Sequence, residues 1–309
     1  MVSDELHQLK GIVIAIKANY YIVEIDFHQF HSFSSNKVNF NKNQRFLCTL
    51  RKRLIHRGFS VYVGDNVEIE SVDSNTHRAV ICGIEPRKSF FKRPPVANIT
   101  EVYVLLSIQK PSFDFEQASR FLLTAEHSGL QVSLILTKSD LTNNDDLIHK
   151  VKRLRNWGYY PISISVRSGK GVEAFINKIR LSKLAVLCGP SGVGKSSLLN
   201  CLLPDESILI GDLSGKLQRG RNTTRNVQLY SLKEGVFIAD TPGFNRPDLQ
   251  VSPIELQTLF PEIRSQLANS SCKFRDCLHQ DEPGCGIDKN WERYVQYRKL
   301  LNEMINFLD

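Results

Sequence analysis

The stretch GPSGVGKSS at positions 189–197 constrains the fold of this 309-residue chain more than any other feature. It follows the apolar run KLAVLCG and precedes SLLNCLL, so we expect a buried strand, a glycine-rich loop and a helix in succession. The glycines let backbone N–H groups converge on a phosphate, and a helix N-terminus favours negative charge. The stretch therefore predicts a nucleoside triphosphate site in an α/β core.

Two positions of this phosphate loop have expected roles of their own, and the others are expected to contact the nucleotide. We expect Lys195 to reach the β- and γ-phosphates and the Ser196 hydroxyl to ligate Mg²⁺. The full set of expected loop contacts is Gly189, Pro190, Ser191, Gly192, Val193, Gly194, Lys195, Ser196 and Ser197.

A second anchor for the nucleotide follows in GVFIADTPGF, residues 235–244. An apolar strand there is expected to bring Asp240 to the Mg²⁺ shell, 45 residues beyond Lys195, and the Gly243 N–H to the γ-phosphate. The polar stretch GRNTTRN between them is typical of a switch loop. We expect Thr224, in preference to Thr223, to complete the Mg²⁺ coordination.

The base is predicted to be guanine, from two motifs that precede the phosphate loop. TKSD ends an apolar strand, and its Asp140 can accept hydrogen bonds from guanine N1–H and the 2-amino group, which adenine cannot match. The Lys138 stem can cover the base face, and the backbone N–H near Val166 can meet guanine O6. The residues expected around the base are Thr137, Lys138, Ser139, Asp140, Ser165, Val166 and Arg167. The hydroxyl of Thr137 stands where the commoner NKxD motif has an amide, which predicts lower nucleotide affinity.

The N-terminal segment has the pattern of a small barrel that binds a polyanion. Residues 10–84 contain about five short strands, with the period-2 alternation of YYIVEID among them. Residues 1–95 contain 14 Lys and Arg against 9 Asp and Glu, whereas residues 251–309 contain 7 against 9. The run RKRLIHR at 51–57 is expected to follow a phosphate backbone. These features favour an RNA-binding barrel of the OB type.

A cysteine cluster near the C-terminus predicts a metal site. Cys272, Cys277, His279 and Cys285 offer three thiolates and one imidazole, which is a closed tetrahedral set for a structural Zn²⁺. The other cysteines are expected to be buried small hydrophobic residues; they are Cys48, Cys82, Cys188 and Cys201.

Taken in chain order, the motifs TKSD, SVRSGKG, GPSGVGKSS, GRNTT and DTPG resemble those of the circularly permuted GTPases. With the barrel before them and the cysteine cluster after them, the chain is similar to the ribosome small-subunit-dependent GTPase A family. The resemblance implies a bacterial assembly factor that hydrolyses GTP slowly, is stimulated by the small ribosomal subunit and its rRNA, and acts late in subunit maturation.

The chain departs from that family in its switch motif. Family members resemble GRHTT there, and the histidine is a candidate for positioning water, but this chain has Asn222. Phe244 also stands where an unpermuted GTPase often has a water-orienting Gln. We therefore expect slow intrinsic hydrolysis.

The predicted fold is multidomain, with an OB-type β-barrel, a central permuted α/β P-loop GTPase domain and a helical zinc-binding domain. The expected boundaries are 1–84 for the barrel, 85–98 for a linker, 99–248 for the GTPase domain and 249–309 for the zinc domain. We expect a cytoplasmic monomer that uses GTP or GDP with Mg²⁺, holds one Zn²⁺ and has no membrane partner.

Two alternative functions remain open at this stage. One is an RNA-binding module in which the nucleotide has a structural role, and the other is a stand-alone metabolic NTPase. The set of Lys195, Ser196 and Asp240 argues against the first, and Phe244 argues against the second.

Overall fold

The computed structural model describes residues 9–25, 44–92, 95–203, 227–232, 235–240 and 249–306. The chain forms two compact units, each assembled from separate segments. The first, the barrel unit, comprises residues 1–101, 176–187 and 196–244. The second, the clamp unit, comprises residues 102–175, 188–195 and 245–309.

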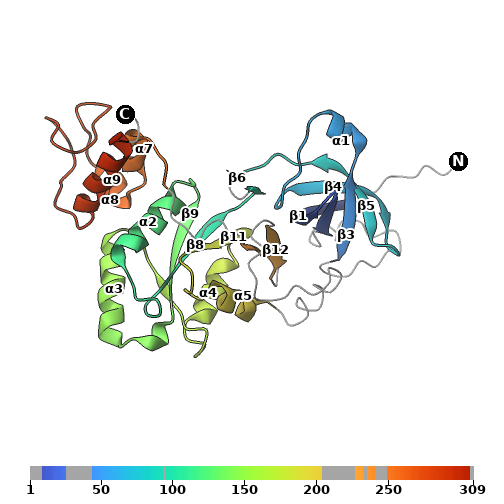
Figure 1. Ribbon diagram of the computed structural model, residues 1–309, viewed down its shortest axis with the longest axis horizontal. Helices are drawn as coiled ribbons and strands as arrows, with labels where there is room; N and C mark the ends of the chain where they lie inside the picture. The colour runs from blue at the N-terminus through green and yellow to red at the C-terminus, as the bar shows by residue number, and fades with distance from the viewer. Residues whose placement is uncertain are drawn as a thin grey trace. The chain divides into compact units, whose positions relative to one another are not determined.

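Five strands of the barrel unit close into a barrel (Figure 1). They are β1 (Leu9–Lys17), β2 (Tyr20–Ile25), β3 (Arg45–Leu50), β4 (Asn66–Asp73) and β5 (Arg78–Ile84). The strands pair in the order β1-β2-β3-β5-β4, and β4 pairs back onto β1. The short helix α1 (Lys52–His56) lies in the connection from β3 to β4. This confirms the predicted five-stranded, OB-like barrel.

The barrel core is mainly apolar, and Glu24 is a buried charged residue that the alternation in β2 places outside. Val23 and Ile25 point inward as the alternation in β2 predicts. Glu24 is also buried, because the Arg45 guanidinium on β3 pairs with its carboxylate at 2.9 Å. A cross-strand ion pair thus overrides the alternation at this position.

The segment predicted as a linker, residues 85–98, is part of the folded barrel unit. Strands β6 (Phe90–Lys92) and β7 (Pro95–Ala97) pair in an antiparallel ladder, and Val96 is fully buried. Arg87 forms an ion pair with the buried Asp65, with 2.7 Å between Nε and Oδ1. Since an unpaired buried carboxylate is costly, this ion pair ties the segment to the barrel.

Three further strands belong to the barrel unit. Strand β11 (Leu184–Cys188) pairs in parallel with β13 (Phe237–Asp240), and β12 (Gln228–Ser231) pairs antiparallel with β13. Strand β12 also contacts β1 through Gln228 and Ala15. Helices α4 (Val172–Ile179) and α5 (Lys195–Leu202) flank β11 in the sequence.

The clamp unit begins with a small α/β sheet. Its strands are β8 (Glu101–Ser107), β9 (Gln131–Thr137) and β10 (Ile162–Ser163), with β9 in the middle. Strand β8 is buried along its whole length, as its apolar run predicts, and β10 is parallel to β9. Helices α2 (Phe115–Glu126) and α3 (Asn144–Asn156) connect the strands.

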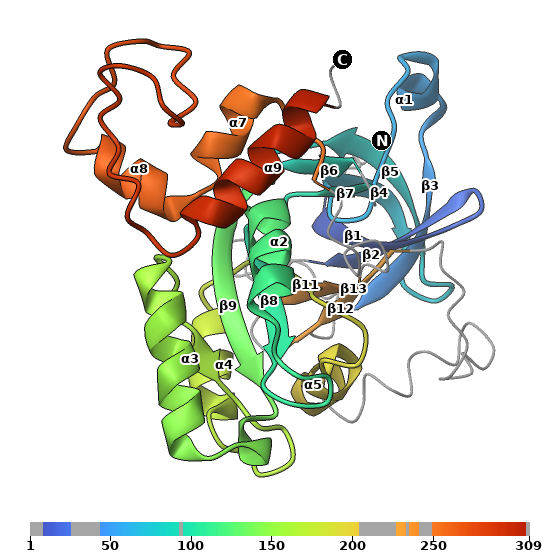
Figure 2. The same ribbon diagram turned by 60° about the vertical axis from the view of Figure 1, so that its left-hand side comes forward.

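Three C-terminal helices complete the clamp unit: α7 (Pro253–Thr258), α8 (Pro261–Leu267) and α9 (Tyr294–Asn306). The predicted apolar stripe of α9 is buried through Tyr297, Leu300, Leu301 and Met304. These side chains share one core cluster with Leu123 of α2, and Figure 2 shows α9 lying beside α2. The C-terminal helices are therefore docked on the α/β sheet's own helix.

A buried arginine lies within this docking contact. Arg293 is only 2% exposed, and its Nε donates to the Glu262 carboxylate at 2.7 Å. Its Nη1 donates to Ser119 of α2 at 3.2 Å, and the guanidinium lies 4.6 Å from the Trp157 ring centroid. One cation thus contacts α2, the end of α3 and the start of α8 together.

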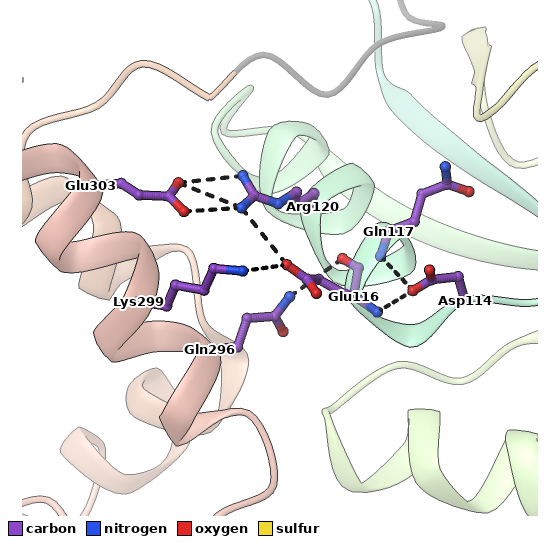
Figure 3. Close-up of polar contacts among 7 residues, drawn as sticks. All are labelled: Asp114, Glu116, Gln117, Arg120, Gln296, Lys299 and Glu303. Carbon is purple, nitrogen blue, oxygen red and sulfur yellow. Dashed lines mark hydrogen bonds and ion pairs between the residues drawn. The ribbon is translucent and has the colours of Figure 1, made fainter.

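Ion pairs with partly exposed side chains also link α2 to α9 (Figure 3). The Arg120 guanidinium of α2 reaches the Glu303 carboxylate of α9 at 3.2 Å, and Lys299 Nζ reaches Glu116 at 3.0 Å. The Gln296 amide donates to the Glu116 backbone carbonyl at 3.3 Å. Exposed pairs of this kind contribute only about 0–1 kcal/mol each, so the core and Arg293 dominate the docking energy.

The membrane prediction has one structural test. No helix in the described part of the chain has the length and apolarity needed to span a lipid bilayer.

We expect Arg293→Met to lower the free energy of unfolding by about 3–5 kcal/mol, because it leaves the Glu262 carboxylate buried without its cation. The matched control is Lys299→Met, which removes an exposed pair and should change stability by less than about 1 kcal/mol. Urea denaturation of both variants measures the difference. Equal losses in the two variants would contradict this account of the docking.

Candidate nucleotide site and metal centre

The phosphate loop has the backbone geometry that its glycines predict. Gly189, Gly192 and Gly194 all have positive φ, which L side chains rarely adopt. A Cβ added at Gly189 would lie 2.1 Å from the Leu105 carbonyl oxygen of β8, so only glycine fits there. The loop leads directly from β11 into α5, as the strand–loop–helix prediction requires.

Lys195, the lysine of this loop, folds back over it. Its ammonium group donates to the carbonyl oxygens of Gly189 and Pro190 at 2.7 and 2.8 Å. The positive charge is therefore held at the loop, beside the N-terminal turn of α5, where Ser196 and Ser197 lie. A helix N-terminus and a cation together make this loop suited to phosphate.

Two residues of TKSD contact the phosphate loop directly. The Thr137 hydroxyl, 3% exposed at the end of β9, donates to the Val193 carbonyl at 2.6 Å. Lys138 has a positive φ of 57°, and its ammonium group donates to the Gly192 carbonyl at 2.7 Å. Segments 54 and 56 residues apart in sequence are thereby joined by side-chain hydrogen bonds.

Asp140 lies in the 3-10 helix Ser139–Leu141. A hydrogen bond from the Ser165 hydroxyl, with smaller contributions from Arg167 and Lys138, lowers the pKa of this carboxyl group. The ionised carboxylate is the state needed to accept two hydrogen bonds from a guanine edge.

The turn after β10 joins the TKSD turn. The Ser139 N–H donates to the Ile164 carbonyl at 3.1 Å, and the buried Ser165 accepts from the Ser168 N–H at 3.1 Å. Val166 and Arg167 follow in the same turn. The structure therefore brings together the two motifs predicted to surround the base.

Of the remaining residues predicted to be catalytic, Asp240 is described by the structure and the others are not. Asp240 is the last residue of β13, and because β13 is parallel to β11, its backbone lies at the carboxyl edge of those strands. Thr224 and Gly243 lie outside the described residues, as do Asn222 and Phe244.

Sequence reasoning missed a third segment at this site. Lys138 also donates to the Lys110 carbonyl, in the loop that follows β8. A small cavity behind this loop is lined by Ser107, Asp114, Gln117, Pro190 and Val193, among others. Asp114 caps α2 by accepting from the N–H groups of Glu116 and Gln117, as Figure 3 shows. The loop that follows β8 contains no recognisable motif, so its contact with Lys138 could not be predicted from the sequence.

The four predicted metal ligands converge. Their ligand atoms all lie within 4.8 Å of one another. His279 Nδ1 lies 3.5 Å from the Cys272 and Cys277 sulfurs and 3.6 Å from the Cys285 sulfur. A tetrahedral zinc with Zn–S near 2.3 Å and Zn–N near 2.0–2.1 Å requires about 3.6 Å between sulfur and nitrogen. The donor set therefore fits a tetrahedral metal.

Burial shifts the protonation equilibria of two of these four side chains. Burial raises the pKa of the Cys277 thiol to about 12 and lowers the pKa of His279. A neutral imidazole is ready to ligate, whereas buried thiols ionise only beside a cation.

Helix α9 fastens the ligand loop to the rest of the clamp unit. The Tyr294 hydroxyl donates to the His279 carbonyl at 2.9 Å, and the Tyr297 hydroxyl donates to the Leu278 carbonyl at 2.6 Å. Glu282 accepts from the N–H groups of Leu278 and Gln280. These contacts, which no metal-ligand spacing reveals, hold His279 in place.

The cysteines outside the cluster follow the sequence prediction with one exception. Cys48, Cys82 and Cys188 are buried, but Cys201 is exposed. It lies on α5, whose buried residues are Leu198 and Leu199. The prediction was wrong for Cys201 because a helix hides only one of its faces.

The fold and the site define a P-loop GTPase in which the TKSD and SVRSGKG segments precede the phosphate loop. The family model for the RsgA GTPase matches residues 84–250. The protein named "Small ribosomal subunit biogenesis GTPase RsgA" from Prochlorococcus marinus strain MIT 9303 is 52% identical over 305 residues, covering 98% of this chain and 95% of its own. The protein of the same name from Synechococcus sp. strain CC9605 is also 52% identical, over 293 residues, covering 95% of this chain and 93% of its own.

Two solved structures resemble this chain over nearly its whole length. YjeQ from Thermotoga maritima has a TM-score of 0.74 and 29% identity, covering 96% of this chain and 99% of that one. YloQ, described as a circularly permuted GTPase, has a TM-score of 0.74 and 26% identity, covering 99% and 98%. The chain belongs to the RsgA GTPase family and is a GTP hydrolase of permuted motif order.

We expect Thr137→Val to weaken GDP binding by roughly 5- to 150-fold, because the Val193 carbonyl loses its buried donor and the phosphate loop loses its tie to the TKSD turn. Thr137→Ser keeps the hydroxyl and should stay within roughly threefold of the unaltered protein. Titration with a fluorescent GDP analogue measures both. Equal affinity of the Val and Ser variants would show that the hydrogen bond plays no part in binding.

Proposed function

We propose that this GTPase assists late maturation of the small ribosomal subunit, binds that subunit through rRNA, and hydrolyses GTP slowly until the subunit stimulates it. The observation that carries the proposal is the end-to-end likeness to proteins named for small ribosomal subunit biogenesis, at 52% identity over 98% of this chain. A likeness confined to the GTPase domain would not extend to the flanking domains that contact a partner.

The nucleotide chemistry follows from the chain's own groups. Lys195 exchanges the Gly189 and Pro190 carbonyls for the β- and γ-phosphate oxygens, which neutralises charge there. Ser196 and Asp240 would hold Mg²⁺, with Thr224 completing the set in the GTP state. Bound Mg²⁺ would supply charge neutralisation between the β- and γ-phosphates. The Gly243 N–H would donate to the γ-phosphate.

Guanine selection is assigned to Asp140 and the turn beside it. Its carboxylate, kept ionised chiefly by the Ser165 hydroxyl, would accept from guanine N1–H and the 2-amino group. Lys138 would cover the base, since its stem already spans from the TKSD turn to Gly192. The Val166 backbone N–H would meet O6.

Slow intrinsic turnover is the expected state of the isolated protein. Phe244 cannot hydrogen-bond to the attacking water, and Asn222 can do so without acting as a base near neutral pH. The orienting group would then come from the bound subunit or from the switch loop. The rate of GTP hydrolysis would then rise only when the protein is bound to the subunit.

The barrel unit offers a surface for rRNA around α1. Leu54 anchors the helix in the barrel core, and Arg51 pairs with Glu70 at 2.9 Å. Lys52, Arg53 and Arg57 remain exposed to solvent. Such a cluster on a small barrel suits a phosphate backbone, whose binding releases counterions and weakens as salt rises.

The metal at the C-terminal cluster is proposed to be one structural Zn²⁺. Three thiolates and one imidazole at tetrahedral separations leave no position for a substrate. The ion would hold the loop 272–285 closed over α9. We further propose that the protein works as a monomer in the cytoplasm, where maturing subunits are found.

We expect GTP turnover to rise at least tenfold when purified small ribosomal subunits are added, and Lys195→Ala to abolish turnover under both conditions. The reason is that subunit binding supplies the missing orientation of water, whereas Lys195 stabilises the phosphate charge in every case. Phosphate release under multiple-turnover conditions measures both.

The same assay separates the alternative functions. A high rate without subunits would indicate a stand-alone NTPase. Nucleotide binding with no turnover, even beside subunits, would indicate an RNA-binding module in which the nucleotide is structural.

We expect the purified protein to contain about one zinc per chain, and Cys285→Ser to lose that zinc on dialysis and unfold at lower urea, because the ligand loop packs on the α9 core. Cys201→Ser, which changes an exposed cysteine outside the cluster, is the matched control. Elemental analysis and urea titration measure the two effects. Zinc retention should fall as pH falls, since protons compete for the thiolates, and full retention by Cys285→Ser would refute the assignment.

A further inference from the structure

A groove in the clamp unit lies between the start of α2, the end of α3 and the start of α9. Its volume is about 310 Å³, and Phe115 of α2, Trp157 at the end of α3 and Val295 of α9 are among its lining residues. None of the lining residues belongs to the nucleotide site or to the metal centre. The groove is open to solvent, and no side chain of the described residues fills it.

The floor of the groove is aromatic, and side-chain contacts hold its rings in place. Trp157 is only 2% exposed, and its ring centroid lies 5.5 Å from that of the half-buried Phe115 in an edge-on arrangement. The Arg153 guanidinium lies 3.5 Å from the Phe115 centroid, and the buried Arg293 guanidinium lies 4.6 Å from the Trp157 centroid. Since each ring packs against the other ring and a cation, a partner that contacts this floor has few side chains to immobilise.

The exposed charges of the lining are already paired. The Arg153 Nε donates to the Glu292 carboxylate at 2.8 Å, and the Lys299 Nζ lies 3.0 Å from the Glu116 carboxylate, the pair that Figure 3 shows. A nucleic acid phosphate would have to separate one of these cations from its carboxylate. The groove therefore differs from the cation-rich surface around α1, and its charge pattern does not favour RNA.

Val295 carries the apolar surface from the floor to the rim of the groove. It is the second residue of α9 and is 79% exposed. Glu292 lies three residues before it and Lys299 four residues after it, so the two charges flank Val295 on one wall of the groove. The Gln296 amide beside Val295 donates to the Glu116 carbonyl at 3.3 Å. A partner thus meets an apolar strip with charges of both signs beside it.

This arrangement suits a protein segment better than a small molecule. Small-molecule sites have volumes of roughly 300–1,000 Å³ and enclose most of their ligand, whereas this groove is open and lies at the lower limit. An amphipathic helix can insert an apolar side chain and keep its charged residues at the rim. The Lys299 side chain is 59% exposed, more than the other charges of the two pairs, so an acidic residue of the helix can reach it.

We propose that this groove binds an amphipathic helical segment of a small-subunit ribosomal protein, with an apolar side chain over Phe115 and Val295 and an acidic side chain beside Lys299. The proposal rests on the proposed function of this GTPase on the small ribosomal subunit. It adds a protein contact on the clamp unit to the rRNA contact proposed for the barrel unit.

The first test is the affinity of full-length variants for purified small subunits, measured by co-sedimentation with a GTP analogue. Val295→Asp should weaken binding about tenfold or more, because a carboxylate would be left unpaired within the contact, and Val295→Ile should bind normally. An acidic residue suits the first turn of α9, so the urea midpoint of Val295→Asp should not fall. Ile148→Asp is the matched control, because Ile148 is 63% exposed on α3 and does not line the groove.

The charge at the rim has its own variant. Lys299→Glu should weaken binding roughly three- to tenfold, because it opposes the acidic side chain of the partner, and Lys299→Arg should bind normally. Unchanged affinity of Lys299→Glu would contradict the proposed pairing.

The second test identifies the class of partner. A photoreactive benzoyl-phenylalanine at position 295 should crosslink to a ribosomal protein in bound subunits. The crosslinked peptide should contain apolar residues three or four positions apart and a nearby acidic residue. A crosslink to rRNA or to a second copy of this chain, or none in complexes that have formed, would overturn the proposal.

The outcomes also separate the two levels of inference. If the unaltered protein binds subunits and Val295→Asp binds equally well, the groove contact is wrong while the proposed function stands. If the unaltered protein does not bind subunits at all, the proposed function fails, and this contact fails with it.

Discussion

The nucleotide site depends on two hydrogen bonds from the TKSD turn to the phosphate loop. Thr137 donates to Val193 and Lys138 donates to Gly192, so the segment proposed to bind the base is attached to the segment proposed to bind the phosphates. Neither bond depends on which segment comes first in the chain. This is why permuted motif order is compatible with a working GTPase site, since the site requires only that the two loops meet at the carboxyl edge of the sheet.

The second organising contact is the docking of the C-terminal helices on α2. Leu123 shares a core with α9, and Arg293 links Glu262 to Ser119 and Trp157. Asp114 caps the N-terminus of α2 and lines the small cavity beside Pro190 and Val193, and Arg120 of the same helix pairs with Glu303 of α9. The loop that carries the cluster of Cys272, Cys277, His279 and Cys285 is thus part of the same compact unit as the TKSD turn.

Local sequence patterns predicted a large part of this arrangement. The strand–loop–helix around GPSGVGKSS, the five-stranded barrel and the convergence of Cys272, Cys277, His279 and Cys285 are all present. Each depends on short-range chemistry: glycine conformations, alternation along strands, or ligand spacing. The segment 85–98, expected to be a linker, contains two short paired strands and an ion pair from Arg87 to Asp65, a residue distant in sequence that carries no local signal.

By itself, the sequence determined which chemical groups the chain carries: a phosphate loop, a carboxylate in the TKSD motif and a Cys₃His ligand set, each defined by residues close together in the chain. Only the tertiary structure decided which partners these groups have. It pairs Thr137 with the Val193 carbonyl, brings in the Lys110 carbonyl, and places Arg293 in a buried contact. The physical reason is that backbone carbonyls and buried ion pairs are selected by packing between distant segments, which no local pattern encodes.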